Sequence, residues 1–464
     1  MKLIKGVNAP SIMFLVGLTL LPILSLLGFL KALFPLPLFL LAASAFIAFL
    51  SKRGSAEESL KKTLLALSSI SLLLLLFFAF TAKAAVITEY NLPPGSAPIS
   101  LVLDNRSYVW FTEYGSNRIG RLIPGNIAPY EIREFKLPLG SKPWGIAYEN
   151  STKRRIWFTE YSRHKIGVIT EVNGGWNLTE FSLFNDAGPR GIAIEPNYEG
   201  TDTARIWFTE FNTGSIGALY LNTTFNGAPN VVYEWFLPDS NSQPLSIIYV
   251  NGKVWFTEYQ GDRIGCIELI DGGGNETLLR EWPLISGSRP WGISNDTYGN
   301  IWVTLSGRNR IAKLNPYTNE ITEYLIPTPG SGPRGIIVDP FNNVWFAEHN
   351  ANKIGKLSPG SNVIVEFELA SSAPTGITYA KFDPEPPTEN GKIWFTDEDG
   401  DMLGRIDPTK AITTATVSTI ARALTSSSTA TTVGSSTAIE TTYNTFTSSA
   451  TFAEPNDITA MTMT

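Results

Sequence analysis

A short motif that recurs along the middle of the chain constrains the fold more than any other feature. Its first copy reads VWFTEYGSNRIGRL, from Val109 to Leu122. Every copy starts with Val or Ile followed by Trp, and the seven tryptophans are Trp110, Trp157, Trp207, Trp255, Trp302, Trp345 and Trp394. Successive copies lie 43 to 50 residues apart, and a period of this size indicates stacked supersecondary units.

Each repeat contains four short runs of aromatic and β-branched residues, with turn residues between them. The first run has the pattern Pro-x-Gly-Ile, as in Pro143 to Tyr148, and the second is the Trp-Phe-Thr-Glu (WFTE) run. An Ile-Gly run follows, and the fourth is like Arg133 to Pro138. Such runs are typical of strands, and four antiparallel strands per repeat of this length form one blade of a β-propeller.

The ends of the repeated region predict how the ring closes. The chain enters with a run of the fourth type, Ile87 to Pro93, and leaves with one of the third type, Leu403 to Ile406. The last repeat therefore lacks its outer strand, and the entering strand fits that place. We predict an all-β fold over residues 87–407, a seven-bladed propeller closed by a 1+3 seam. An open solenoid would expose a sheet edge and leave the entering strand unpaired.

The first part of the chain, residues 1–86, is overwhelmingly apolar and too long for a cleaved signal peptide. A helix of about 20 apolar residues crosses the hydrocarbon core of a bilayer. We predict three transmembrane helices, at 11–30, 33–50 and 63–82. Only Lys31 separates the first two segments, so a re-entrant pair is the alternative there.

Basic residues predict the orientation of these helices. The region before the first segment and the region between the second and third lie on the same side of the membrane when all three segments cross it. These two regions contain most of the basic residues, namely Lys2, Lys5, Lys52, Arg53, Lys61 and Lys62. Lys31 alone falls on the other side. Because the side richer in Lys and Arg faces the cytoplasm, we expect a multi-pass protein of the cell membrane with its propeller and tail extracellular.

The last part of the chain, residues 408–464, consists largely of Ser, Thr and Ala. A segment with so few large apolar residues cannot bury a core, so we predict a flexible tail that is open to O-glycosylation. Sequons for N-glycosylation, which are compatible with an extracellular location, occur at Asn105, Asn150, Asn177, Asn222, Asn275 and Asn295. The net charge of −6 argues against a nucleic-acid partner, and the single cysteine, Cys266, excludes an internal disulfide.

Two positions in every repeat are expected to meet on one face of the propeller, where turn connections carry function. The innermost strand starts on that face, and the second strand returns to it. The first position, which we name the inner ring, follows the proline of the first run and holds Ile99, Trp144, Arg190, Leu245, Trp291, Arg334 and Thr375. The second, the carboxylate ring, closes the WFTE run and holds Glu113, Glu160, Glu210, Glu258, Leu305, Glu348 and Asp397.

The inner ring contains the candidate binding residues. Trp144 and Trp291 lie three blades apart in it, as do Arg190 and Arg334, so the members of each pair lie nearly across the ring from each other. Aromatic faces and guanidinium groups suit an extended ligand with anionic or π-bearing groups, such as an anionic glycan. The alternative is that the aromatic side chains plug the tapering channel and each arginine pairs with a nearby glutamate.

The carboxylate ring has a structural explanation of its own. A carboxylate at the end of a strand readily accepts hydrogen bonds from turn amides. Four repeats also carry a basic residue five positions downstream, namely Arg118, Lys165, Arg263 and Lys353.

Acidic residues of the last repeat form the candidate metal site. Asp397, Asp399 and Asp401 are acidic enough for a hard cation, but they lack the spacing of a twelve-residue calcium loop. A solvated turn is the alternative.

The chain has two histidines, His164 and His349, and both lie in the turn after the WFTE run. His349 with Glu348 is the candidate acid–base pair. The default interpretation for both histidines is a surface side chain with satisfied hydrogen bonds, because no Ser or Cys nucleophile pattern flanks either of them.

The blade pattern, WFTE followed by Asn-Lys or Asn-Arg, Ile-Gly and then Pro-x-Gly-Ile, resembles the virginiamycin B lyase (streptogramin lyase) family over roughly residues 87–407. The resemblance implies a monomeric seven-bladed propeller that opens a cyclic depsipeptide antibiotic by elimination. It also implies magnesium as a cofactor, and two histidines and a glutamate as catalytic residues in Pro-His and Glu-Pro-His-Gly contexts at the starts of inner strands.

This chain departs from that family at the catalytic positions. The inner ring, from Ile99 to Thr375, contains no histidine. None of the residues before its prolines is glutamate, since they are Ala97, Lys142, Gly188, Gln243, Arg289, Gly332 and Ala373. The family's catalytic residues therefore do not carry over, and a shared fold alone does not establish the reaction.

Two functions from different classes remain. The first is a membrane-anchored, cell-surface propeller that binds a ligand or acts as a scaffold, with a glycan, a peptide or another envelope protein as its partner. The second is a carbon–oxygen lyase of the family's type, which would act with magnesium on a cyclic or ester-containing substrate from a relocated site.

Overall fold

The structure of the chain is a computed structural model, and it divides into two compact units, Met1–Ala84 and Ala85–Thr464. It describes residues 87–124, 130–150, 154–172, 175–184, 186–195, 205–221, 231–269, 277–369, 373–380, 391–407, 421–424, 441–442, 450–452 and 460–463. The three predicted transmembrane helices lie outside these ranges. Within them, no helix is long and apolar enough to cross a membrane.

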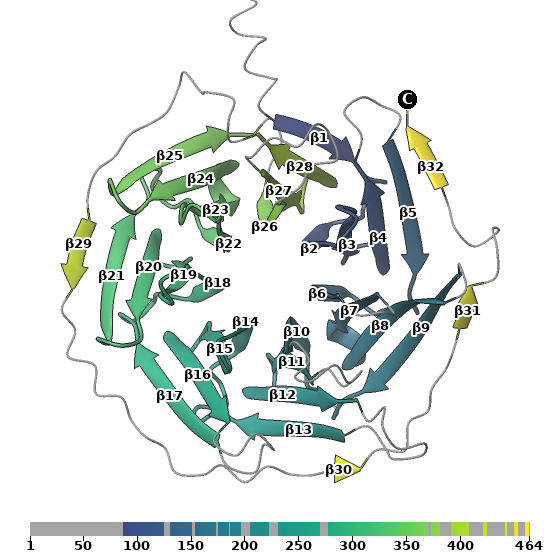
Figure 1. Ribbon diagram of the computed structural model, residues 1–464, viewed down its shortest axis with the longest axis horizontal. Helices are drawn as coiled ribbons and strands as arrows, with labels where there is room; N and C mark the ends of the chain where they lie inside the picture. The colour runs from purple at the N-terminus through teal and green to yellow at the C-terminus, as the bar shows by residue number, and fades with distance from the viewer. Residues whose placement is uncertain are drawn as a thin grey trace, which may run out of the picture. The chain divides into compact units, whose positions relative to one another are not determined.

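Seven antiparallel sheets surround a central channel in Ala85–Thr464 (Figure 1). We number the blades 1 to 7 by their innermost strands, which are β2 (Pro98–Leu103), β6 (Pro143–Glu149), β10 (Pro189–Glu195), β14 (Pro244–Val250), β18 (Pro290–Asn295), β22 (Pro333–Val338) and β26 (Pro374–Ala380). The second strands are β3 (Val109–Glu113), β7 (Arg155–Glu160), β11 (Arg205–Glu210), β15 (Lys253–Glu258), β19 (Ile301–Leu305), β23 (Val344–Glu348) and β27 (Lys392–Asp397). The third strands are β4 (Arg118–Ile123), β8 (Lys165–Val172), β12 (Ser215–Tyr220), β16 (Arg263–Leu269), β20 (Arg310–Asn315), β24 (Lys353–Ser358) and β28 (Met402–Ile406). The outer strands are β5 (Tyr130–Lys136), β9 (Gly175–Ser182), β13 (Val231–Phe236), β17 (Thr277–Pro283), β21 (Glu320–Leu325), β25 (Val363–Glu368) and β1 (Ile87–Asn91). The prediction of an all-β, seven-bladed propeller is confirmed.

The ring closes by the predicted 1+3 seam. The first strand, β1, pairs antiparallel with β28 and so supplies the outer strand of blade 7, with Ile87 opposite Ile406. Its Tyr90 is buried and stacks on Trp394 of the same blade, with ring centroids 5.3 Å apart. The seam is therefore held by a core contact as well as by the strand ladder.

The structure describes extended backbone at four places in the tail, and the flexibility of the tail stays a prediction. Its four short strands are β29 (Ala421–Leu424), β30 (Thr441–Thr442), β31 (Ala450–Phe452) and β32 (Ala460–Met463). They pair with the outer strands β21, β13, β9 and β5, respectively. An outer strand of a blade has unpaired backbone groups on its free edge, and an extended Thr-rich segment can satisfy them.

The hydrophobic core lies between neighbouring blades. Trp157 of blade 2, for example, packs with Ile206 and Phe208 of blade 3. Buried indole N–H groups need acceptors, and a carboxylate at the end of the innermost strand supplies one at 2.7–3.0 Å in five blades. These pairs are Trp110–Asp104, Trp157–Glu149, Trp207–Glu195, Trp302–Asp296 and Trp345–Asp339. The repeated motif is thus the scaffold of each blade.

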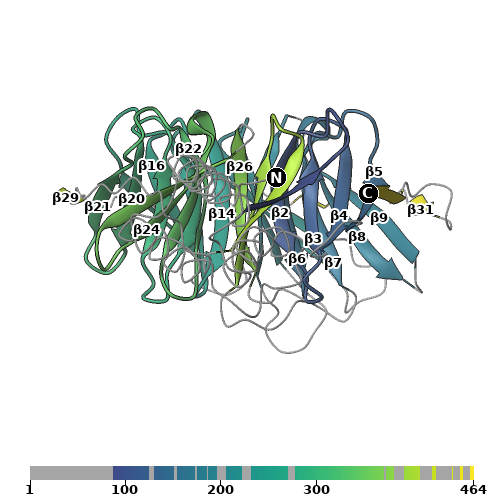
Figure 2. The ribbon, with the colours of Figure 1, turned by 90° about the horizontal axis from the view of Figure 1, so that it is seen from above.

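Strand register distinguishes the two faces of the ring, which Figure 2 shows edge-on. In blade 2, Pro143 pairs with Glu160 at one end of the first two strands, and Glu149 pairs with Arg155 at the other. We name the face at the Pro143 end the mouth face and the opposite one the far face. The other blades repeat this register, so the inner ring and the carboxylate ring both lie at the mouth face, as expected.

Candidate functional site

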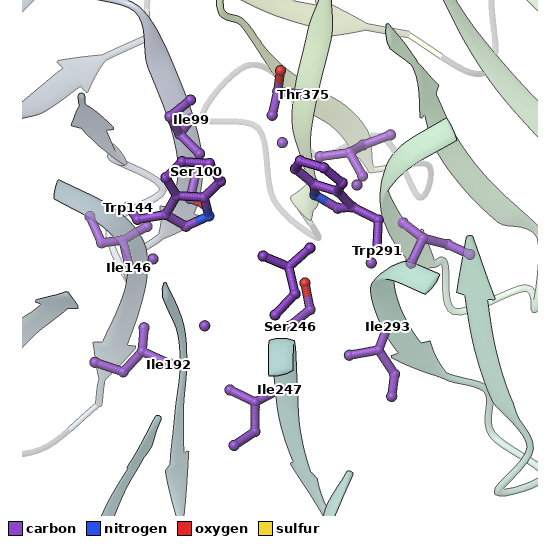
Figure 3. A pocket seen from close by; sticks show the side chains of 18 of the residues that line it. Ile99, Ser100, Trp144, Ile146, Ile192, Ser246, Ile247, Trp291, Ile293 and Thr375 are labelled. Atoms are coloured by element: carbon purple, nitrogen blue, oxygen red, sulfur yellow. The ribbon is translucent and has the colours of Figure 1, made fainter. Parts of the chain in front are cut away.

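A cavity of about 220 Å³ occupies the centre of the ring. All seven innermost strands line it, mostly with isoleucine side chains and glycine backbone, and Ser100, Ser246 and Thr375 are polar exceptions. Trp144 and Trp291 lie on opposite sides of the cavity (Figure 3). The expectation that these tryptophans lie nearly across the ring from each other is therefore met.

A threonine hydroxyl from the WFTE run positions the inner ring. In blade 2, the Thr159 hydroxyl accepts a hydrogen bond from the Gly145 amide (2.9 Å) and donates one to the Arg190 carbonyl of blade 3 (2.8 Å). Five other threonines bond the inner-ring carbonyl of the next blade in the same way, namely Thr112, Thr209, Thr257, Thr304 and Thr396. Blade 6 has Ala347 at this position, so the carbonyl of Thr375 is not held by such a hydroxyl.

The glycine after the inner-ring residue allows the innermost strands to approach closely. A Cβ atom on Gly145 would lie 2.2 Å from the Arg190 carbonyl oxygen, and one on Gly292 would lie 2.5 Å from that of Arg334. Both obstacles are backbone atoms, which cannot move aside as the end of a flexible side chain can. The Pro-x-Gly-Ile pattern therefore sets the width of the channel and the position of the arginines at its mouth.

Arg190 lies within a cluster of aromatic rings at the mouth. Its guanidinium carbon is 3.5 Å from the ring centroid of Phe211, 4.4 Å from that of Trp144 and 4.9 Å from that of Tyr161. Burial lowers the pKa of Arg190, and the neighbouring groups that raise it are tyrosines. Among the described residues, its buried Nε atom has no hydrogen-bond partner. One side of the mouth therefore carries a guanidinium charge that aromatic faces stabilise and no described carboxylate neutralises.

Arg334 lies on the other side of the mouth in a different electrostatic environment. It stacks over Trp291 at 4.6 Å, and its Nη1 atom forms an ion pair with Glu398 at 2.8 Å. The same Glu398 carboxylate accepts a hydrogen bond from Thr375 at 3.1 Å. Neutralisation of an arginine by a glutamate is thus observed for Arg334, although the partner is not a member of the carboxylate ring.

His349 and Glu348 occupy different environments. The Glu348 side chain is fully enclosed within blade 6, where burial and the charge of Glu366 raise the pKa of Glu348 to about 8. His349 is half-buried, and its Nδ1 atom lies 3.4 Å from the Thr375 hydroxyl at the mouth. Burial, with the charge of Arg334, lowers the pKa of His349. The structure therefore brings a neutral imidazole to the mouth and leaves Glu348 inside the blade.

The other members of the carboxylate ring are also enclosed within the blades, with exposed fractions of 0 to 1 %. In blade 1, the side chain of Glu113 accepts a hydrogen bond from Ser116, and Arg118 pairs with Glu134 of the outer strand at 3.1 Å. Lys165 and Lys353 likewise pair with an outer-strand glutamate. The ring thus belongs to buried polar clusters inside the blades and contributes no lining to the cavity.

The candidate metal ligands have backbone partners. Asp397 is fully buried and accepts the Gly400 amide, while Asp401 accepts the amides of Gly95 and Ala97 at 2.7 Å each. Asp399 is exposed beside them.

Asp401 occupies a position that recurs before every third strand. All residues at this position have positive φ angles, and they are Asn117, His164, Gly214, Asp262, Asn309, Asn352 and Asp401. The side chain of His164, for instance, accepts the Gly188 amide at 3.1 Å, and Asp262 accepts two amides of the following loop at 2.7 Å each. This bridging position, as we name it, links six blades to the loop of the next through a side-chain acceptor, and only Gly214 of blade 3 has no side chain to do so. The links explain the structural role of both Asp401 and His164.

Magnesium, which the family implies, requires oxygen ligands such as carboxylates. Within the described ranges, no group of three or more His, Cys, Asp or Glu side chains is placed to hold a metal ion. The Glu398 carboxylate at the mouth is engaged by the Arg334 guanidinium. The described residues therefore do not fit a magnesium site.

A third set of residues lies at the mouth and was not predicted from the sequence. The residue directly after the WFTE run is half-buried in every blade, and this turn ring consists of Tyr114, Tyr161, Phe211, Tyr259, Ser306, His349 and Glu398. Tyr114 and Tyr259 pack edge-on against Trp144 and Trp291, with centroids 5.5 and 5.6 Å apart. The available signal was the position one residue beyond the carboxylate, where four of the seven repeats carry an aromatic residue.

Comparisons with known proteins agree with this architecture. The family model described as the virginiamycin B lyase family matches residues 277–446. Virginiamycin B lyase from Staphylococcus aureus is 30% identical with a TM-score of 0.57, and the match covers 69% of this chain and 98% of that chain. A streptogramin B lyase structure is 32% identical with a TM-score of 0.57, covering 69% of this chain and 97% of that chain.

A third similar structure is a catalytically inactive histidine-to-alanine variant of the staphylococcal lyase with quinupristin. It is 30% identical with a TM-score of 0.55, and the match covers 69% of this chain and 98% of that chain. The comparison with curated proteins gave no match. With this identity over nearly the whole length of the solved lyases, and with the blade motif in all seven repeats, the chain belongs to the virginiamycin B lyase family.

Proposed function

We propose that this protein is a ligand-binding propeller of the cell surface whose site is the mouth of the central cavity. The observation that carries the proposal is the pair of tryptophans on opposite sides of the cavity, each stacked with an arginine. Indole faces and guanidinium groups at one opening suit a ligand that combines an apolar or aromatic body with an anionic group. A surface glycan, a peptide or another envelope protein can present both.

The two sides of the mouth suggest how such a ligand is oriented. Arg190 has no described carboxylate partner, whereas Arg334 is paired with Glu398. An anionic group gains more from an arginine whose charge is not yet neutralised, and a charge-assisted hydrogen bond contributes on the order of 1.5–3 kcal/mol. We therefore assign the anionic group to Arg190 and a neutral hydrogen-bonding group to the side of Arg334, Thr375 and His349.

Lyase activity is the second candidate, because His349 lies beside Thr375 at the mouth with a lowered pKa. A neutral imidazole can accept a proton, as an elimination requires. Against this candidate stand the absence of histidine from the inner ring and of glutamate from the positions before its prolines.

Purified full-length protein incubated with a streptogramin B antibiotic and magnesium separates the two candidates. We expect no ring opening above the rate without protein, as followed by chromatography and mass spectrometry. Ring opening that disappears in His349→Ala, and persists in the control His164→Ala on the bridging position, would establish the lyase and refute the proposal.

The location at the cell surface rests on the hydrophobic segments and on their basic residues. We infer three membrane-spanning helices with the propeller and the tail outside the cell, because Lys and Arg concentrate before the first segment and after the second. Protease added to intact cells should remove an epitope placed in the propeller. An epitope that is lost only after lysis would contradict this orientation.

A further inference from the structure

We propose that the far face of the propeller is its glycosylated face, with N-linked glycans on Asn105 of blade 1, Asn150 of blade 2 and Asn295 of blade 5. The inference rests on the proposed location of the propeller outside the cell, because Asn-x-Ser/Thr sites are used in exported parts of proteins. It adds a covalent modification and the face that carries it, opposite the mouth of the cavity.

All three asparagines lie at hairpins that turn at the far face. Asn105 lies in the hairpin between β2 and β3, and Asn150 directly follows β6 in the hairpin between β6 and β7. Asn295 is the last residue of β18 and pairs with Ile301, the first residue of β19. In each of these blades the first two strands also pair at the mouth face, through the proline of the first strand. The hairpin that joins them is therefore at the opposite face.

A carboxylate shapes two of these hairpins and leaves the residues beside it accessible. Asp104 accepts the backbone amides two and four residues downstream at 2.9 Å each, and Asp296 does the same. Asp296 also accepts the indole N–H of Trp302, so its side chain is turned into the blade. Thr297, which supplies the hydroxyl of the sequon of blade 5, is exposed, as is Asn105. The recognition groups of these sequons thus lie at the surface of well-formed turns.

Asn105 and Asn150 come together from neighbouring blades. Both are exposed, and the Nδ2 atom of Asn105 donates to the Oδ1 atom of Asn150 at 3.3 Å. The Tyr148 hydroxyl donates to the same oxygen at 3.4 Å. Both donors therefore hold the Asn150 amide by its oxygen and leave its Nδ2 branch for another partner. A glycosylated asparagine keeps one of its two N–H groups, so the hydrogen bond from Asn105 is compatible with a glycan on either residue.

The modification uses the side-chain amide nitrogen as the acceptor. Nδ2 forms a bond to the anomeric carbon of a lipid-linked sugar phosphate, the bond from that carbon to the phosphate oxygen breaks, and the lipid phosphate leaves. The amide proton passes to a base of a separate transferase enzyme. This chain supplies the acceptor only, which is an Asn-x-Ser/Thr sequence at the surface.

The mouth face offers no comparable acceptors. None of the described asparagines in its turns starts a sequon. Three of them, Asn117, Asn309 and Asn352, occupy the bridging position, where their side chains accept amides of the next loop. The residue two positions after each is a fully buried isoleucine, and a hydroxyl there would place an unpaired polar group in the core. The repeat itself therefore excludes sequons at this position, and glycans on the far face leave the mouth uncovered.

The remaining sequons do not enter the proposal. Asn177 is half-buried within β9, between β8 and β31. Asn222 and Asn275 lie outside the described residues, as does Thr152 of the Asn150 sequon.

Mass spectrometry of peptides from the full-length protein, isolated from the cells that make it, tests this inference. We expect sugar masses on the peptides of at least two of the three asparagines. For blade 5, Asn295→Gln and Thr297→Ala should each remove the sugar from its peptide, whereas the control Thr297→Ser, which keeps the sequon, should retain it. Sugar that remains in Asn295→Gln would be attached to a hydroxyl group and would contradict an N-linked glycan at that position.

Protease treatment of intact cells distinguishes failure of this inference from failure of the proposed location. Sugar on fewer than two of the three asparagines, in protein whose propeller is cut from intact cells, would overturn the inference and leave the location intact. A propeller that is protected from protease until lysis would overturn the location and the inference with it.

Discussion

At the scale of single residues, complementary packing explains how the repeats vary. The Phe ring of the WFTE run lies against the glycine of the Ile-Gly run, so that a Cβ atom on Gly120 would lie 2.1 Å from the ring of Phe111. Blade 5 departs at both positions, with Val303 in place of Phe and Ala312 in place of Gly, and these two residues face each other across β19 and β20. The smaller side chain on one strand leaves space for the methyl group on the next.

This pairing predicts a compensated double mutant. Val303→Phe alone should lower the free energy of unfolding by about 1–3 kcal/mol, because the ring meets the Ala312 methyl group in a closed core. Val303→Phe with Ala312→Gly should recover most of that loss, since it recreates the pair of the other blades. Urea unfolding of both single variants and the double variant measures the coupling, and strictly additive losses would contradict the explanation.

At the scale of the elements, the side chain at the bridging position links the third strand to the loop of the next blade in every blade except blade 3, where the residue is Gly214. At the seam, this link joins segments that are far apart in the chain, since Asp401 of blade 7 holds the loop between β1 and β2 through Gly95 and Ala97. Asp262 makes the same pair of hydrogen bonds between blades 4 and 5, where the chain itself connects the two elements. The same chemistry therefore has different consequences at the two places.

Asp401→Ala should accordingly be more harmful than Asp262→Ala. Each variant loses two charge-assisted hydrogen bonds, but only the first removes a contact that closes the ring, so we expect a further loss of about 1–2 kcal/mol in the free energy of unfolding. Hydrogen exchange of the β1 amides should also accelerate in Asp401→Ala alone. Equal losses in urea unfolding, with unchanged exchange in β1, would show that the seam needs no such link.

At the scale of the whole molecule, repetition made the fold predictable and left part of the site hidden. The seven tryptophans and the spare strand, Ile87–Asn91, are sufficient to predict the blade number and the seam. The inner ring was predictable because strand direction assigns it to one face. The ion-pair partner of Arg334 was not predictable, because Glu398 lies 64 residues away in the next blade and comes one residue after the end of β27. Spacing within a repeat gives no information on contacts between turns of different blades.

Buried carboxyl groups predict how stability depends on pH. Burial first, and then the charge of a neighbouring glutamate, raises the pKa of Glu234, Glu258 and Glu348 to about 8. In the window between the ordinary value of 4.5 and about 8, the folded state holds protons that the unfolded state releases, so stability falls as the pH rises. Urea midpoints should therefore be higher at about pH 5 than at about pH 8, and Glu258→Gln should flatten this slope. A midpoint that rises with pH would contradict the assignment.

The central claim is that the mouth binds a ligand whose anionic group meets Arg190, and binding to arrays of acidic glycans and acidic peptides tests it most directly. Full-length wild type is compared with Arg190→Gln and with the control Arg289→Gln, which removes an equal charge from an exposed position beside the inner ring. The account predicts that wild type and Arg289→Gln bind the same anionic ligands and that Arg190→Gln loses them by at least tenfold in affinity, about 1.4 kcal/mol. Anionic ligands bound with the same affinity by wild type and Arg190→Gln, or by no variant at all, would contradict it.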